Sequence, residues 1–156
     1  MTRIIIIDDH KLFSDGLAAL LEKDANFAVI AQIYDSREAL SKVNELKSDL
    51  VIADFNMPYI NGLSLTKILL AANPDLKILI LSMYNEERFV KDFKDAGAMG
   101  YLTKTTEIQE VKQGILAIVS GKSVFPQLVT NQDSIYNQDL FLKKFSLSLR
   151  EKEVVD

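Results

Sequence analysis

The sequence predicts an α/β fold built on a doubly wound, five-stranded parallel sheet. Five short apolar segments alternate with five segments whose apolar residues recur at helical spacing. The first apolar segment, residues 4–7, is four consecutive isoleucines, which is typical of a parallel strand buried on both faces. Right-handed crossovers would then place helices on both faces of the sheet.

Composition narrows the class of protein. The chain has 156 residues, of which 48% are hydrophobic and 26% charged, as in an ordinary globular domain. Its net charge of −4 gives no basic field for nucleic acid, and the lack of cysteine excludes disulfides and thiolate metal sites. No signal peptide is recognisable, and no apolar stretch approaches the roughly 20 residues that span a bilayer. We therefore expect a cytoplasmic protein that makes no contact with membranes.

The elements follow one another in strict alternation. Strands are predicted over residues 3–7, 27–33, 50–53, 76–81 and 98–102. The first helix should bury one face, formed by Leu12, Phe13, Gly16, Leu17, Leu20 and Leu21. Ser36 is interpreted as the N-cap of the second helix, and residues 63–72 as the third. The fourth helix, residues 86–96, should end at Gly97, and a Thr106–Gln109 capping box should open the fifth.

The C-terminal residues change in character. Residues 1–121 are predicted to form the α/β domain, and residues 122–146 read as a linker because they contain no clear strand. Residues 147–156 begin a new helix, with Ser148 as N-cap and Glu151 three positions later. About two helical turns are too few to be stable without partners, so we expect this segment to be the start of a truncated second domain.

Polar side chains end four of the predicted strands. Asp8 and Asp9 follow the first strand, Asp54 the third, Ser82 the fourth and Lys104 the fifth. If the strand order is 2-1-3-4-5, the first and third strands are neighbours, and the three carboxylates converge. Like charges about 4 Å apart repel by roughly 4 kcal/mol at an effective dielectric near 20. Mg²⁺, which prefers carboxylate oxygens and is commonly shared with phosphate, would relieve this repulsion.

This set of side chains favours phosphoryl transfer onto a carboxylate. Asp54 would be the nucleophile, Lys104 and the metal would neutralise the transferring group, and Ser82 would donate a hydrogen bond to it. Each residue taken alone has a plainer interpretation, such as a turn, a surface charge or a helix cap. His10, the only histidine, is interpreted as neither ligand nor phosphocarrier, because a hard-oxygen site has no need of imidazole.

The motifs in this order resemble those of a known family. The Asp8-Asp9 pair, the segment DFNMP at residues 54–58 with Gly62 after it, Ser82, and GYLTK at residues 100–104 are similar to the receiver domain of two-component response regulators. The resemblance implies a flavodoxin-like fold and phosphoryl transfer from a sensor histidine kinase to Asp54. It also implies that Mg²⁺ is held by Asp8, Asp9, Asp54 and the Asn56 carbonyl, and that Ser82 and Tyr101 form a switch pair.

A second resemblance concerns the end of the chain. Residues 147–154 are similar to the opening of a LuxR-type helix-turn-helix domain, which implies a transcriptional regulator of the NarL/FixJ class. DNA would then be contacted only through the missing C-terminal domain. Such a protein catalyses its own phosphorylation and dephosphorylation and is otherwise not an enzyme. Apolar positions on the first and last helices leave a homodimer face open.

Two other functions compete with this interpretation. An α/β phosphohydrolase could use Asp54 catalytically, but it needs a general acid, conventionally a second aspartate two residues later, and this chain has Asn56 there. A degenerate receiver could serve only as a protein-binding scaffold, although the complete set of site residues argues against it.

Overall fold

The computed structural model describes residues 1–126, and the predictions for residues 127–156 lie outside the described residues. A five-stranded parallel sheet has the order β2-β1-β3-β4-β5, which confirms the predicted fold class and strand order. The strands are β1 (Thr2–Ile7), β2 (Phe27–Ile33), β3 (Leu50–Asp54), β4 (Ile78–Ser82) and β5 (Gly100–Thr103).

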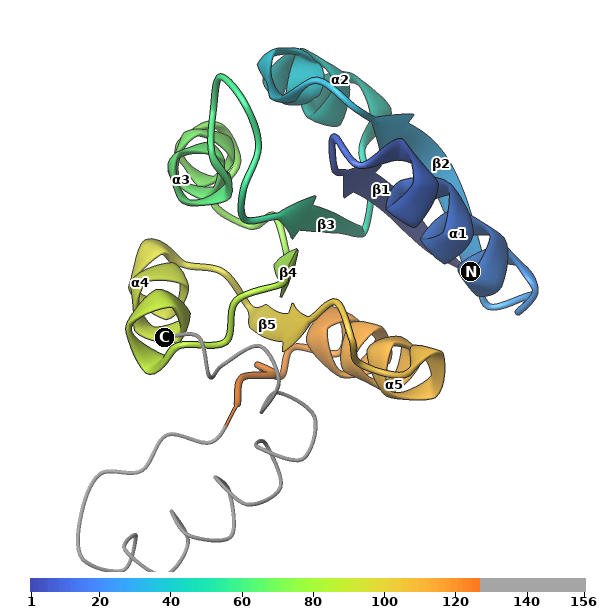
Figure 1. Ribbon diagram of the computed structural model, residues 1–156. Helices are drawn as coiled ribbons and strands as arrows, with labels where there is room; N and C mark the ends of the chain where they lie inside the picture. The colour runs from blue at the N-terminus through green and yellow to red at the C-terminus, as the bar shows by residue number, and fades with distance from the viewer. Residues whose placement is uncertain (127–156) are drawn as a thin grey trace, which may run out of the picture. The chain divides into compact units, whose positions relative to one another are not determined.

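Helices cover both faces of the sheet, as Figure 1 shows. Helices α1 and α5 pack on one face, and α2, α3 and α4 pack on the other. Their bounds are α1 (Lys11–Glu22), α2 (Ala39–Leu46), α3 (Gly62–Ala72), α4 (Glu87–Ala96) and α5 (Ile108–Val119), with a short 3₁₀ helix, η1 (Ser36–Glu38), before α2. No helix within residues 1–126 is long and apolar enough to cross a membrane.

The three central strands form the core. Every residue of β3 and β4 is buried, as are the four isoleucines of β1. Because β1 and β3 are paired with Ile7 opposite Ala53, the next residue on each strand, Asp8 and Asp54, lies at the same level of the sheet. The buried aliphatic pairing therefore sets which polar groups meet at the carboxyl edge.

Two predicted helix starts are wrong. Asp35, not Ser36, caps the first turn, because its carboxylate accepts a hydrogen bond from the Arg37 N–H at 2.9 Å. Helix α5 begins at Ile108 with Glu107 as N-cap and no side-chain cap, so the predicted capping box at Thr106 does not form. The Thr106 hydroxyl instead lies 3.3 Å from that of Thr103. Neighbouring polar residues offered equally good caps, and local sequence could not choose among them.

The predicted buried face of α1 is also partly wrong. Leu17 and Leu21 are buried, but the side chain of Leu12 is 86% exposed and Leu20 is 41% exposed. At 3.6 residues per turn Leu12 and Leu17 lie about 140° apart around the helix axis, so both cannot face the sheet. By contrast, the predicted end of α4 is confirmed, since Gly97 takes the left-handed conformation with φ of 105°.

Residues after α5 return to the sheet. The Val124 N–H donates to the Met99 carbonyl at 2.9 Å, and the Tyr101 N–H donates to the Val124 carbonyl at 2.9 Å. This bridge is parallel and lies against Gly100, where an added Cβ would stand 3.1 Å from the Val124 carbonyl oxygen. The open edge of β5 is thus partly covered by the chain that follows α5.

Gly62 should be the least replaceable glycine. A Cβ there would lie 2.2 Å from the Asp54 carbonyl oxygen and 2.8 Å from the Phe55 Cα, whereas a Cβ at Gly16 in α1 would meet nothing within 4 Å. We expect Gly62→Ala to destabilise the protein on the order of 3 kcal/mol. The matched Gly16→Ala should stabilise it by about 0.5–1 kcal/mol. Urea unfolding followed by circular dichroism measures both, and equal stabilities would contradict the close approach.

Candidate functional site

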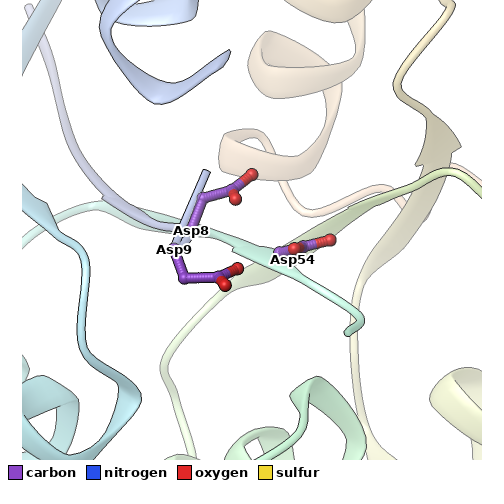
Figure 2. A group of neighbouring side chains, drawn as sticks. All are labelled: Asp8, Asp9 and Asp54. Carbon is purple, nitrogen blue, oxygen red and sulfur yellow. The ribbon is translucent and has the colours of Figure 1, made fainter. Parts of the chain in front are cut away.

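Three carboxylates converge at the carboxyl edge of the sheet. Asp8 and Asp9 follow β1, Asp54 ends β3, and an oxygen from each lies within 4.8 Å of the others. Figure 2 shows the three side chains next to one another at the ends of these neighbouring strands. Asp8 and Asp54 are buried and Asp9 is exposed, so the cluster opens to solvent on the Asp9 side.

Lys104 supplies the opposite charge. Its Nζ lies 2.9 Å from Asp8 Oδ2 and 3.3 Å from Asp54 Oδ1, and its side chain is only 5% exposed. The Lys104 N–H donates to the Ser82 carbonyl at 2.8 Å, which fixes the start of the side chain beside β4. The ammonium also lies 4.6 Å from the centre of the Phe13 ring on α1. One buried cation is therefore shared between two buried carboxylates.

The pKa of Asp54 reflects its burial beside a second carboxylate. Burial, with a further contribution from Asp8, raises the pKa of Asp54 from 3.8 to about 6, although Lys104 and the Phe55 N–H act in the opposite direction. Two buried carboxylates face one lysine, so by formal charge one negative charge is left unpaired among these three groups. The donor set consists of hard oxygens crowded at one point, which is the chemistry that Mg²⁺ fits.

His10 and Asn56 flank this cluster. The His10 backbone N–H donates to Asp8 Oδ1 at 2.8 Å, and the His10 side chain makes no capping bond to α1. Asn56 lies two residues after Asp54, in the loop between β3 and α3, and its side chain is exposed. A role for its backbone carbonyl as a metal ligand stays a prediction.

Ser82 is the last residue of β4, and Tyr101 lies inside β5, opposite Ile80. The Ser82 hydroxyl is buried and accepts a hydrogen bond from the Tyr84 N–H at 2.9 Å. The Tyr101 hydroxyl donates to the Tyr84 carbonyl at 2.6 Å, and its ring is fully buried. Burial raises the pKa of Tyr101 to about 12, so it remains a neutral donor. Both residues are therefore tied to the same loop residue.

An aromatic cluster beside the site was missed by the sequence analysis. Phe55, the residue after Asp54, packs edge-on against Tyr84, Phe89 and Phe93 with ring centres 4.8–5.4 Å apart. Phe93 in turn lies 5.6 Å from Tyr101. The spacing of Phe89 and Phe93 on one helical face was a usable signal. Their partner Phe55 lies in a loop and could not be paired with them from sequence.

Comparisons with known proteins identify the class. Residues 4–116 match the response regulator receiver domain family. The regulatory protein DegU of Brevibacillus brevis is 33% identical over 83% of this chain and 55% of its own length. The response regulator GacA of Pseudomonas viridiflava is 34% identical over 93% of this chain and 64% of its own length.

Solved structures of response regulators also resemble this chain. A LuxR-family two-component response regulator from an Aurantimonas species has a TM-score of 0.77 at 29% identity, covering 90% of this chain and 99% of that one. The isolated receiver domain of RcsB from Salmonella enterica was solved in the presence of the phosphomimetic BeF₃⁻. It has a TM-score of 0.74 at 26% identity, and the match covers 81% of this chain and 94% of that one.

The chain belongs to the response regulator receiver domain family. Its structural neighbours include response regulators of the LuxR and NarL type. It spans 55% and 64% of the length of the two curated relatives described above. The resemblance inferred from the motifs is therefore confirmed at the level of the domain.

Crowding of the carboxylates predicts an unusual stability effect. In the absence of divalent ions, Asp54→Asn should raise the melting temperature at neutral pH, because it removes a buried negative charge. Asp9→Asn should raise it less, because Asp9 is exposed.

The effect should depend on pH. A folded-state pKa raised to about 6 means that the native protein binds more protons than the unfolded chain between about pH 4 and 6. Wild-type stability should therefore fall across this range as pH rises, with a cost on the order of 2 kcal/mol above it. The stability that Asp54→Asn gains over the wild type should be largest above pH 6 and absent below pH 4. Calorimetry across pH, with exposed Asp75→Asn as control, tests this; a pH-independent difference would contradict it.

Proposed function

We propose that this chain is the phosphoacceptor part of a two-component response regulator and that Asp54 receives a phosphoryl group from a sensor histidine kinase. The observation that carries the proposal is the meeting of Asp8, Asp9 and Asp54 with the buried Lys104 at one edge of the sheet. Membership of the receiver family and the BeF₃⁻ complex of the related RcsB receiver support it.

The transfer needs a nucleophile that is already ionised. A carboxylate oxygen of Asp54 attacks phosphorus, the bond from phosphorus to the imidazole nitrogen of the kinase phosphohistidine breaks, and the imidazole keeps the electron pair and takes a proton. With a pKa of about 6, Asp54 is mostly ionised at neutral pH, so no general base is required. Lys104, bonded to Asp54 Oδ1, lies where it can pair with an oxygen of the arriving group.

A divalent cation completes the proposal. Asp8, Asp9 and Asp54, with the Asn56 carbonyl, are the residues that would hold Mg²⁺, and the bound ion would neutralise charge on the phosphoryl oxygens. Their crowding without such an ion, seen in the raised pKa of Asp54, supports this assignment.

We propose that Ser82 senses the modification. Its hydroxyl accepts from the Tyr84 N–H, which leaves the hydroxyl proton available for a phosphoryl oxygen. Tyr84 also accepts from Tyr101, so a shift of Ser82 toward the phosphoryl group would be felt by Tyr101. We propose Ser82 and Tyr101 as the switch pair.

The remaining expectations complete the proposed role. The protein would control transcription through an attached LuxR-type DNA-binding domain in the cytoplasm, and would act as an enzyme only on its own phosphoryl group. A homodimer is proposed on α1 and α5, which expose Leu12, Leu20 and Leu116. Leu12 and Leu20 also line a cleft of about 300 Å³.

Phosphorylation can be measured directly. Incubation with acetyl phosphate and Mg²⁺ should add the mass of one phosphoryl group to the intact protein, and EDTA or Asp54→Asn should abolish the addition. Asp75→Asn, an exposed carboxylate away from the site, is the matched control. No mass increase in the wild-type chain would refute the proposal, and steady hydrolysis of phosphate esters would favour a phosphohydrolase instead.

A further inference from the structure

The loop that follows Asp54 contains a strained turn. The Ile60 N–H donates to the Pro58 carbonyl at 2.8 Å, which closes a three-residue turn around Tyr59. Tyr59 has a φ of 71°, the left-handed region that a bulky side chain rarely adopts. Such a conformation costs about 1–3 kcal/mol and persists only where surrounding contacts hold it.

Ser36 supplies those contacts from another part of the chain. Its hydroxyl donates to the Pro58 carbonyl at 2.8 Å and accepts from the Ile60 N–H at 3.1 Å, so one side chain joins both ends of the turn. Ser36 is 2% exposed, and water cannot easily replace the hydroxyl there. The burial of this serine has no local explanation, because Asp35 is the residue that caps η1.

The neighbours of Ser36 hold the same turn from outside. The Arg37 guanidinium lies 3.7 Å from the centre of the Tyr59 ring, and Asp35 fixes the guanidinium with hydrogen bonds of 3.1 and 2.8 Å. The strand before them also reaches the site, because the Ile33 carbonyl accepts from the Asp8 N–H at 3.0 Å. The end of β2 thus contacts Asp8, and η1 contacts the loop that follows Asp54.

Resting on the function proposed above, we propose that Ser36 is a positioning residue for the Asp54 site. Its hydroxyl holds the turn at Pro58–Ile60 and thereby the backbone at Asn56, only two residues before the turn, in the conformation that binds the divalent cation. The other end of the loop is already fixed, since the Gly62 N–H donates to the Phe55 carbonyl at 2.7 Å. Ser36 therefore ties the part of the loop around Tyr59 to η1, in addition to the backbone bond that closes the turn.

The test compares Ser36→Ala with Ser48→Ala in the 156-residue chain. Ser48 has a buried hydroxyl without a hydrogen-bond partner among the described residues, so it controls for loss of a buried serine oxygen. Mg²⁺ binding is followed by amide NMR titration. Loss of the Ser36 hydroxyl, with its two hydrogen bonds to the turn, should weaken Mg²⁺ binding about three- to tenfold in Ser36→Ala. Ser48→Ala should match the wild type.

Two further measurements separate positioning from general stability. With acetyl phosphate, Ser36→Ala should need more Mg²⁺ for half-maximal phosphorylation but reach the wild-type rate at saturation. In metal-free protein, the Ile60 amide should exchange with solvent faster in Ser36→Ala, while amides of β4 should be unchanged. If Ser36→Ala does not fold, Ser36→Cys, which fits the same space with a weaker donor, takes its place.

The outcomes are distinct. Unchanged Mg²⁺ affinity and unchanged exchange at Ile60 would overturn the role of Ser36 and leave the proposed function intact. Equal losses of Mg²⁺ affinity in Ser36→Ala and Ser48→Ala would also overturn it, because the effect would be general. Failure of the wild-type chain to bind Mg²⁺ would refute the proposed function and this role together.

Discussion

The arrangement depends on two buried carboxylates sharing one buried lysine. Asp8 and Asp54 come from neighbouring strands, and Lys104 reaches both from the end of β5. One lysine cannot compensate two carboxylates, and burial together with the charge of Asp8 raises the pKa of Asp54. The site is therefore held in an electrostatically incomplete state, and a second cation or a phosphoryl group with its counter-ion changes the balance. A fully neutralised cluster would have less to gain from binding either.

Such a site requires a rigid support, because like charges separate wherever the backbone can move. The isoleucines of β1 and the fully buried strands β3 and β4 provide it. Hydrophobic burial contributes about 25 cal/mol per Å² of apolar surface, so the packing of these strands helps to offset the cost of the crowded charges. Gly62 adds a tight approach between the start of α3 and the Asp54 backbone, which keeps the acceptor strand and its loop in register.

The sequence was sufficient where one pattern excluded the alternatives. Residues 4–7 could only be a strand buried on both faces, and carboxylates after two such strands had to meet once those strands were neighbours. The sequence was insufficient where several residues could occupy the same structural position, such as a helix cap. Ser36 was predicted to be the cap, but in the folded chain Asp35 caps η1 and Ser36 binds a loop 22 residues away. Leu12 was predicted to be a core residue from the helical spacing of the apolar residues, but the structure leaves it exposed on α1.

The same limit explains why the aromatic cluster was invisible in the sequence, although it connects the site to the rest of the domain. Phe55 is covalently next to Asp54, and its ring contacts both the loop after β4 and the helix α4. Tyr84 belongs to that loop, accepts from Tyr101 and donates to Ser82. A displacement of Ser82 toward Asp54 therefore moves a residue that packs on Phe55 and holds Tyr101. Close-packed rings cannot absorb such a shift locally, so the movement has to reach α4 or β5. Helix α4 buries only Val90 and Phe93, fewer residues than its neighbour α3, so it is freer than α3 to respond.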